Sequence, residues 1–308
     1  MKKFWFGAFL CLILFLSSCS KTEVSIVSDQ NDQLISVTTP IPKYTITTTA
    51  TTTTTPTITT TPFLPATPTI TQTSTETLDP HLVQTGPGSF LCPILLYHHV
   101  LVNNSSGTEY TVTVDQFRSQ MQWLKENGYQ TISVQDMVDT IHDGKVLPIK
   151  PIIITFDDGN EDIYNNAYPI LQEMGFTATM YLISEAIGDY GNFTENEIQE
   201  LSSAGWEFGS HSRTHANLNT TPDRTDEICG SKNQLMELLN IPINSFAYPY
   251  GIENDRAMNI AFGCGYTSGA GLGSYTIQTQ SKLFYFSRRE IKSYFDMQRF
   301  ITTVTDIR

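Results

Sequence analysis

The run Pro151-Ile-Ile-Ile-Thr-Phe-Asp-Asp-Gly159 carries two adjacent carboxylates directly behind a short apolar segment. Because the segment is rich in β-branched residues and has no polar alternation, it predicts a strand buried on both faces, as in parallel sheets covered by helices. Asp157 and Asp158 would lie at the carboxyl end of that strand, where buried carboxylates are costly unless a cation or hydrogen bonds compensate them. A plain turn or helix N-cap is the alternative interpretation.

Short apolar runs and helical patterns alternate on both sides of this strand. Further strands are expected at 93–97, 178–183, 206–209, 245–248 and 283–287. Helices are expected near 115–127, 133–144, 162–174, 194–205, 223–240 and 294–304, with another helix and strand near 255–268. This alternation predicts an α/β fold with parallel strands, and a count of about seven or eight units favours a barrel over a small open sheet.

Two histidines follow the strand expected at 206–209, in the run Ser210-His-Ser-Arg-Thr-His215. A spacing of four can bring both imidazoles to one side of a helical turn, as metal ligands require. Together with Asp158, they form a set of two histidines and one carboxylate that leaves coordination positions open for water and substrate. A polar loop with two surface histidines is the alternative.

A third cluster, Phe246-Ala-Tyr-Pro-Tyr-Gly251, also leaves a predicted strand. Pro249 and Gly251 would fix a turn that could aim a backbone N–H into the mouth of the barrel. Taken alone, the cluster would be interpreted as an aromatic-lined loop.

The three clusters, in this order, resemble the polysaccharide deacetylases of carbohydrate esterase family four, the NodB-homology domain, over about residues 91–308. The resemblance implies a distorted (β/α)7 barrel. It also implies that Asp157 is the general base, that Asp158, His211 and His215 bind a divalent metal, and that the Tyr250 backbone N–H helps to hold the oxyanion. Zn²⁺ is the expected metal, with Co²⁺, Ni²⁺, Mn²⁺ or Fe²⁺ as alternatives.

The sequence departs from the common pattern of the family in two places. Ala247 stands where many members have an Arg, and the segment 283–291 has no His where many members have the general acid. The run Leu96-Tyr-His-His-Val100 instead resembles the branch that deacetylates poly-N-acetylglucosamine, which implies that His98 is the acid, with His99 left as an alternative. Arg288 resembles an arginine that lies near the base in that branch.

The function implied by the resemblance is metal-dependent removal of N-acetyl groups from a polysaccharide that contains N-acetylglucosamine. Poly-N-acetylglucosamine, peptidoglycan and chitin-like polymers remain open as substrates. An O-acetyl esterase acting on a xylan-type polymer and a noncatalytic glycan-binding wall protein are the competing hypotheses. No protein partner is evident from the sequence.

The first residues predict secretion and anchoring. Lys2 and Lys3 precede an apolar run that is too short for an ordinary membrane span and suits a signal peptide. The run Leu16-Ser-Ser-Cys19 resembles the lipobox of bacterial lipoproteins, which implies a lipidated Cys19 at the outer face of the cytoplasmic membrane. The alternative is a plain signal peptide with an incidental cysteine.

Composition divides the chain into three parts: a signal peptide at 1–18, a linker at 19–89 and a catalytic domain at 90–308. Residues 38–77 contain 21 Thr and 6 Pro and show no apolar periodicity, so a disordered tether is expected. This segment explains much of the low charged fraction of 16%. The net charge of −13 argues against nucleic-acid binding, which needs a basic face.

Three cysteines fall in the predicted catalytic domain: Cys92, Cys229 and Cys264. One disulfide is compatible with a secreted chain, but their odd number and the lack of a C-x-x-C spacing favour three buried thiols.

Overall fold

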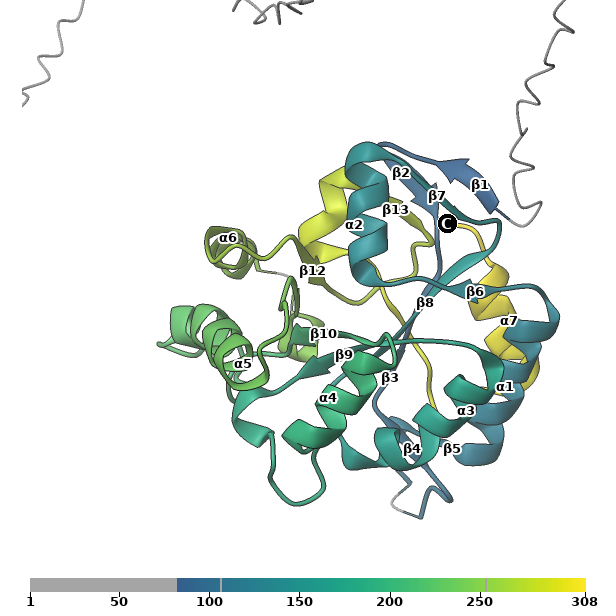
Figure 1. Ribbon diagram of the computed structural model, residues 1–308, viewed down its shortest axis with the longest axis horizontal. Coiled ribbons are helices and arrows are strands. Elements are labelled where there is room, and N and C mark those ends of the chain that lie inside the picture. Colours follow the sequence, from purple (N-terminus) through teal and green to yellow (C-terminus); the bar gives the residue numbers. More distant parts are fainter. Residues whose placement is uncertain (1–81, 106, 253) are drawn as a thin grey trace, which may run out of the picture. The chain divides into compact units, whose positions relative to one another are not determined.

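The computed structural model describes residues 82–105, 107–252 and 254–308, and its centre is a curved parallel sheet (Figure 1). The strand order is β12-β11-β10-β9-β8-β3-β14, and every neighbouring pair is parallel. The strands are β3 (Ile94–Tyr97), β8 (Pro151–Phe156), β9 (Thr179–Leu182), β10 (Glu207–Ser210), β11 (Ser245–Ala247), β12 (Ser268–Ala270) and β14 (Arg289–Glu290). A short strand, β6 (Gln130–Thr131), also pairs with the start of β8.

The segment that leads into β14 joins the two edges of this sheet. On one side, the Gly271 N–H donates to the Phe286 carbonyl at 2.9 Å, and the Gly273 N–H donates to the Arg288 carbonyl at 3.0 Å. On the other side, β14 pairs with β3. The ring of strands is thereby closed, which confirms the predicted distorted (β/α)7 barrel.

Seven α-helices in the described part of the chain surround the strands: α1 (Val114–Glu126), α2 (Val134–Asp143), α3 (Tyr168–Met174), α4 (Glu195–Ser203), α5 (Ser231–Leu239), α6 (Asp255–Gly263) and α7 (Met297–Thr305). Capping boxes at Ser133 and Thr194 begin α2 and α4. The π-helical turns η1 (Ile163–Ala167) and η3 (Asp226–Gly230) lead into α3 and α5. Figure 1 shows α1 between α3 and α7 on one flank.

The structure differs from the sequence prediction at the start of the folded part. β1 (Leu82–Thr85), expected to belong to the linker, pairs antiparallel with β7 (Lys145–Pro148). β2 (Ser89–Leu91) likewise pairs antiparallel with β13 (Ile277–Thr279). Leu82–Thr85 of the expected linker therefore form part of a small sheet, and Ser89, its last residue, begins another. The predicted signal peptide, Cys19 and the rest of the linker lie outside the described residues.

The strand predicted at 283–287 is a second correction. Residues Gln280–Tyr285 form the 3-10 helix η5, and the extended segment begins only at Phe286. Leu283 and Phe286 are both buried, and their spacing of three matches a 3-10 turn rather than a strand.

Among the described residues, no helix is both long and apolar enough to cross a bilayer.

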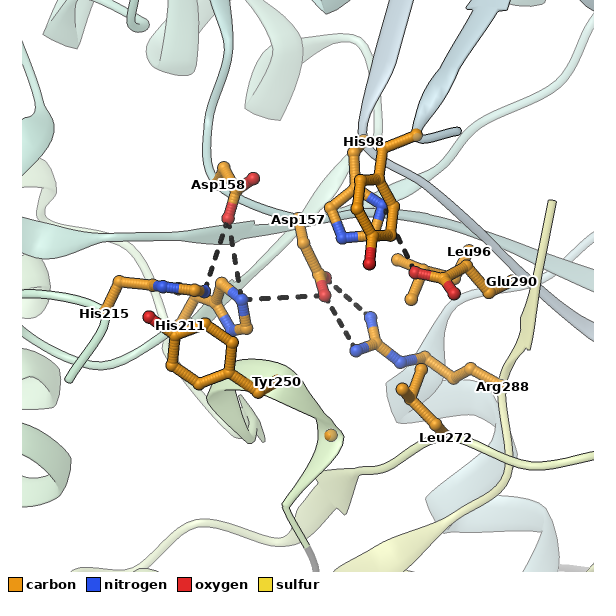
Figure 2. A pocket seen from close by; sticks show the side chains of 12 residues that line it. Leu96, His98, Asp157, Asp158, His211, His215, Tyr250, Leu272, Arg288 and Glu290 are labelled. Carbon is orange, nitrogen blue, oxygen red and sulfur yellow. Dashed lines mark hydrogen bonds and ion pairs between the residues drawn. The ribbon is translucent and has the colours of Figure 1, made fainter. Parts of the chain in front are cut away.

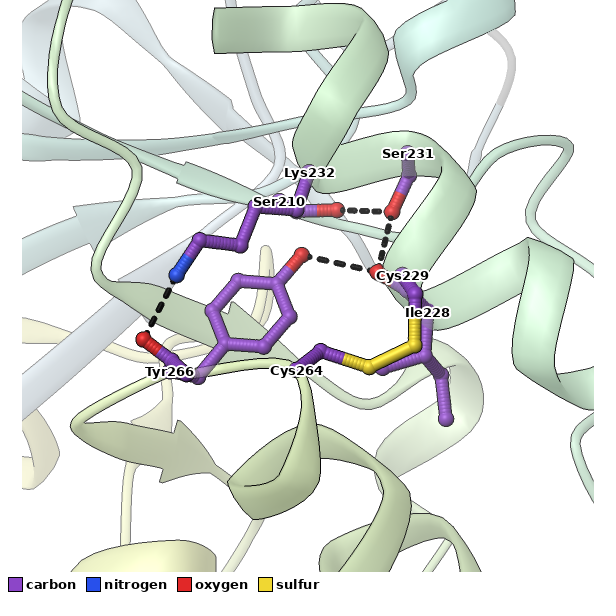
Figure 3. Close-up of a disulfide and its surroundings, with 8 residues drawn as sticks. Ser210, Ile228, Cys229, Ser231, Lys232, Cys264 and Tyr266 are labelled. Atoms are coloured by element: carbon purple, nitrogen blue, oxygen red, sulfur yellow. Dashed lines mark hydrogen bonds between the residues drawn. A yellow bond between two sulfur atoms is a disulfide. The ribbon is translucent and has the colours of Figure 1, made fainter. Parts of the chain in front are cut away.

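A disulfide joins Cys229 on η3 to Cys264 at the end of α6 (Figure 3). Next to it, the Tyr266 hydroxyl donates to the Ile228 carbonyl at 3.0 Å, so the two segments are held together at two points. Cys92 remains a buried free thiol. The prediction of three buried thiols is therefore wrong for two of them, because η3 and the end of α6 meet only in the folded chain.

Glu207, at the amino end of β10, carries a buried carboxylate that faces the start of α2. It accepts hydrogen bonds from the Val134 N–H at 2.6 Å, the Gln135 N–H at 3.2 Å and the Thr179 hydroxyl at 3.0 Å. A carboxylate at a helix N-terminus is favourable because the free N–H groups and the helix dipole both attract it. Burial nevertheless dominates and raises the pKa of Glu207 from 4.5 to about 7.

We expect this carboxyl to make the stability of the protein fall with rising pH. A group with a higher pKa in the folded than in the unfolded chain binds its proton more tightly when folded. Its contribution is therefore complete below about pH 4.5 and is lost as the pH rises through 7, with a size of roughly 3 kcal/mol. Urea unfolding of the wild type and Glu207→Gln between pH 4.5 and 8 measures it. The difference between the two curves should change by this amount, and two parallel curves would contradict the prediction.

Candidate active site

A cavity of about 330 Å³ opens at the carboxyl ends of the barrel strands (Figure 2). Its lining includes all seven side chains that the sequence singled out: His98, Asp157, Asp158, His211, His215, Tyr250 and Arg288. They lie next to the ends of β3, β8, β10, β11 and β14, which are separated in sequence and lie in one continuous sheet. The fold thus brings together every predicted site residue.

Asp158, His211 and His215 form a group that fits a metal ion. Their ligand atoms all lie within 4.8 Å of one another. Asp158 Oδ1 is 3.6 Å from His211 Nε2 and 3.8 Å from His215 Nε2. Two imidazole nitrogens and one carboxylate oxygen on one side of a cavity are a donor set for a divalent cation with open coordination positions.

Unusual backbone conformations are concentrated at this site. Five non-glycine residues in the described chain have positive φ, and four of them lie here: Asp158 (76°), Ser212 (68°), His215 (59°) and Tyr250 (62°). Such conformations cost free energy and persist only where the surrounding structure enforces them. In the loop after β10, the Ser212 hydroxyl accepts a hydrogen bond from the His215 N–H at 2.9 Å, which stabilises the tight turn between the two histidines.

His211 is oriented by a backbone carbonyl on the next strand. Its Nδ1 lies 2.9 Å from the Ala247 carbonyl oxygen, so Nδ1 carries the proton and Nε2 faces Asp158 with its lone pair. The hydrogen bond from His211 Nδ1 to the Ala247 carbonyl fixes the ring plane and the tautomer, as is common for metal-binding histidines. Ala247, where many family members carry an arginine, thus contributes its backbone here.

Glu227 holds the segment between the two histidines and was missed by the sequence analysis. Its carboxylate accepts hydrogen bonds from the Arg213 N–H and the Thr214 N–H, both at 3.0 Å, and from the Thr214 hydroxyl at 2.6 Å. Burial opposes ionisation, but the hydrogen bonds from Thr214 and its neighbours outweigh it and lower the pKa of Glu227. Glu227 lies on η3, two residues before the disulfide-bonded Cys229.

We expect Glu227→Ala to weaken Zn²⁺ binding by about 10–100-fold, the usual cost of losing a group that orients metal ligands. The loss follows because three hydrogen bonds that fix residues 213 and 214 disappear. Competition with a chromophoric chelator measures the affinity. Glu185→Ala is the matched control, since within the described residues the Glu185 carboxylate pairs with the Arg213 side chain, at 2.7 Å, and the backbone contact of Glu185 to the Arg213 carbonyl remains in the variant. Equal Zn²⁺ affinities of Glu227→Ala and the control would show that residues 213 and 214 keep their positions without Glu227, and would contradict the prediction.

Asp157 and Arg288 form a buried, two-pronged ion pair. Arg288 Nη1 donates to Asp157 Oδ1 at 2.6 Å and Nη2 donates to Oδ2 at 2.8 Å. Both side chains are almost fully buried, at 3% and 1% exposure. Burial is the largest single influence and would raise the pKa of Asp157, but the Arg288 charge, its hydrogen bonds and the neighbouring histidines together outweigh burial and lower the pKa to about 2. Arg288 therefore occupies the place expected for an arginine beside the proposed base.

His98 and His99 point to different places, as expected for neighbours at a strand end. His98 lines the cavity, with its ring packed against Tyr110 at 5.0 Å between centroids. Its Nδ1 lies 3.8 Å from Glu290 Oε1 and has no hydrogen-bond partner in the described part of the chain. Burial lowers the pKa of His98, against the attraction of Asp157 and Asp158. His99 instead contacts Asp162 at 3.1 Å, outside this cavity.

Two further cavity residues, Glu290 and Tyr110, were not predicted. Glu290 follows Arg288 by two positions along the extended segment that contains β14, so period-2 alternation could have placed both on the same face. Glu290 is held by Lys292 at 2.5 Å, and Lys292 also lies over the Tyr110 ring at 4.1 Å. Tyr110 comes from the loop between β4 (His99–Leu101) and β5 (Thr111–Thr113), where no sequence pattern marks it.

Comparison with known proteins agrees with this geometry. Residues 144–269 match the family model described as polysaccharide deacetylase. The protein YxkH of Bacillus subtilis (strain 168) is 33% identical over 179 residues, 58% of this chain and 63% of that protein. A Staphylococcus aureus (strain MRSA252) protein named poly-beta-1,6-N-acetyl-D-glucosamine N-deacetylase is 28% identical over 196 residues, 58% of this chain and 67% of that protein.

Solved structures give the same result. The Streptococcus pyogenes deacetylase PplD, in complex with acetate, superposes with a TM-score of 0.65 at 29% identity, covering 70% of this chain and 98% of that one. The chain therefore carries a domain of the polysaccharide deacetylase family. It spans 63% of the length of YxkH, so the similarity concerns this domain and not the whole of that relative.

Proposed function

We propose that the protein is a metal-dependent deacetylase that removes N-acetyl groups from a polysaccharide containing N-acetylglucosamine. The observation that carries the proposal is the composition of one cavity. A donor set for a divalent cation, an ionised carboxylate and a histidine all line it, at the carboxyl ends of three strands, β3, β8 and β10. This is the set of groups that hydrolysis of an amide requires: activation of water, stabilisation of negative charge and protonation of the leaving nitrogen.

Asp158, His211 and His215 would hold the cation, and Zn²⁺ is the metal we propose. Two nitrogen ligands and one carboxylate suit Zn²⁺, although Co²⁺, Ni²⁺, Mn²⁺ and Fe²⁺ accept the same ligands. When bound, such a cation polarises a carbonyl oxygen and lowers the pKa of a water molecule.

Asp157 is the proposed general base. In this role its carboxylate takes a proton from the water that attacks the acetyl carbon. Arg288 keeps the carboxylate ionised and fixes its plane through two hydrogen bonds. The Tyr250 backbone N–H donates a hydrogen bond to the oxygen of the acetyl group as negative charge develops there.

His98 is the proposed general acid. It gives a proton to the sugar nitrogen as the C–N bond breaks, so that acetate and a free amine are released. Glu290, 3.8 Å from Nδ1, is the carboxylate that would orient the ring and stabilise its protonated form, and Tyr110 packs against the ring. The reaction therefore uses Asp157 as the base and His98 as the acid. It hydrolyses the amide C–N bond and cleaves no glycosidic bond.

The substrate proposal rests on two kinds of support. The Staphylococcus aureus relative is named as a deacetylase of poly-β-1,6-N-acetyl-D-glucosamine. The position of His98 directly after β3 is the pattern that the sequence shares with that branch. We therefore rank β-1,6-linked N-acetylglucosamine polymers above peptidoglycan and chitin-like polymers.

The experiment that tests this function measures metal content and acetate release on the full chain. The substrates are β-1,6-linked N-acetylglucosamine oligomers, peptidoglycan, chitin oligomers and acetylated xylan. We expect about one Zn²⁺ per chain and acetate from the amino-sugar polymers. Acetate from xylan alone would favour an O-acetyl esterase. A metal-loaded chain that releases no acetate from any polymer would favour a noncatalytic glycan-binding protein.

We propose further that the protein is secreted and anchored to the outer face of the cytoplasmic membrane through lipidated Cys19. The support is the order of charged, apolar and small residues before Cys19. Mass spectrometry of the mature N-terminus should find a lipidated Cys19. An unmodified N-terminus at another residue would identify a plain signal peptide.

A further inference from the structure

A second cavity, of about 480 Å³, lies beside the active-site cavity. Leu272 lines both of them, so one side chain forms the boundary between the two spaces. Figure 2 shows Leu272 next to Arg288 at the edge of the active-site cavity. The second volume lies within the range of roughly 300–1,000 Å³ that small-molecule sites occupy.

The boundary between the cavities depends on close packing. A side chain at Gly251 would come within 2.4 Å of Leu272, and one at Gly271 within 2.4 Å of the Tyr285 ring. The absence of side chains at these two positions lets Leu272 and Tyr285 lie flat against the backbone. The Tyr285 hydroxyl in turn donates to the Gly251 carbonyl, which links the wall of the second cavity to the proposed oxyanion turn.

The other walls are held by the backbone. The Tyr275 N–H donates to the Ser287 hydroxyl at 3.0 Å, and the Thr276 N–H donates to the Arg308 carbonyl at 3.2 Å. From Ile277 onward, the chain forms β13 and pairs with β2. The cavity is therefore preformed, which reduces the ordering cost of binding.

The lining suits a sugar. Tyr275 is 61% exposed and offers its ring, while Thr279 and Ser281 add hydroxyl groups. Aromatic faces bind the apolar faces of sugar rings, and hydroxyl groups bind sugar hydroxyls.

The charge of the lining differs from that of the active site. Asp157, Asp158 and Glu290 line the active-site cavity, whereas the described lining of the second cavity has Lys282 and Arg308 and no Asp or Glu. Arg308 is paired with Asp306 at 2.6 Å, and Lys282 has no ion pair within the described residues. A glucosamine with a free amine is a cation near neutral pH, but its N-acetylated form is neutral. Lys282 therefore disfavours a deacetylated sugar in this cavity.

We propose that the second cavity is a subsite for an N-acetylated sugar of the same polymer chain, distal to the sugar that is deacetylated. The subsite stacks the sugar on Tyr275 and discriminates against free amines through Lys282. This inference rests on the proposed function, because it assumes a polymer of N-acetylglucosamine. It predicts that binding strengthens with chain length and weakens once the distal sugar has lost its acetyl group.

Titration calorimetry with the full chain carrying Asp157→Asn tests the subsite without turnover. The ligands are the β-1,6-linked N-acetylglucosamine dimer and hexamer and the fully deacetylated hexamer. We expect the acetylated hexamer to bind more tightly than the dimer. Adding Tyr275→Ala should weaken hexamer binding about fivefold to tenfold and leave dimer binding unchanged. Adding Lys282→Glu should increase affinity for the deacetylated hexamer.

Tyr190→Ala and Lys125→Glu are the matched controls, because both side chains are exposed and lie outside the two cavities. Equal affinities for dimer and hexamer, or a Tyr275→Ala variant that binds like the Tyr190→Ala control, would overturn the subsite. Acetate release by the wild type separates the two failures. If the wild type deacetylates the dimer and hexamer equally well, the subsite fails alone. If it binds the hexamer through Tyr275 but releases no acetate, only the catalytic proposal fails.

Discussion

Replacing Asp157 with Asn should lower the rate of acetate release by about 10²–10⁴-fold, the usual contribution of a general base. Asn has nearly the same shape and keeps an oxygen that accepts one hydrogen bond from Arg288, but it cannot take a proton from water. Because the metal ligands are Asp158, His211 and His215, the metal content of the variant should stay at the wild-type level. Steady-state kinetics on N-acetylglucosamine oligomers and metal analysis on the same sample measure both quantities.

The buried guanidinium of Arg288 is the main complication of this test. Its 1% exposure means that removing the Asp157 charge leaves a cation without its partner, which costs about 3–5 kcal/mol in folding free energy when a buried pair is broken. Urea unfolding must therefore show that the variant is folded at the assay temperature. Arg288→Lys serves as a second variant: it keeps the charge but loses the two-pronged geometry, so we expect a smaller fall in rate. A folded Asp157→Asn protein with wild-type activity would exclude Asp157 as the base.

The sequence was sufficient to predict the barrel and the positions of the chemical groups because both depend on local patterns along the chain. Buried strands such as Pro151–Phe156 are continuous apolar runs, and the polar residues that end them mark the carboxyl edge of the sheet. Asp157 directly follows such a run, His211 directly follows β10, and Tyr250 comes three residues after β11. The residues that position them carry no such signal. Glu227 lies in the helical turn η3, and no local sequence pattern indicates that the fold brings its carboxylate to the loop between the histidines.

Pairings between segments that are distant in the sequence also could not be predicted from local sequence patterns. The Cys229–Cys264 disulfide and the pairing of Leu82–Thr85 with β7 join segments that are far apart in sequence and meet only in the folded chain. The helix η5 shows that local propensity can also mislead. Leu283, Phe284 and Tyr285 favour a strand by propensity, yet they form a 3-10 helix that buries Leu283. Tertiary packing outweighs a propensity that amounts to about 1 kcal/mol or less per residue.

The metal triad gives the second large effect. We expect His211→Ala to reduce the metal content to background and to lower acetate release by about 10³-fold or more, since a bound cation contributes several kcal/mol to charge stabilisation. His211 is the most informative of the three ligands. It is 2% exposed, its Nδ1 is fixed by the Ala247 carbonyl, and its Nε2 lies 3.6 Å from Asp158 and 3.7 Å from Asp157. Metal analysis after dialysis, followed by kinetics with and without added Zn²⁺, measures the effect.

Two comparisons separate loss of metal from loss of structure. His142→Ala is the matched control, because His142 is an exposed histidine in the last turn of α2, outside the cavity, and its variant should keep full metal and activity. The wild type treated with a chelator should lose activity and regain it with Zn²⁺, whereas His211→Ala should not recover at the same concentration. If His211→Ala retained one metal per chain, the ion would be bound elsewhere. The group formed by Asp158, His211 and His215 would then have to be explained as a hydrogen-bonded cluster that serves Asp157 alone.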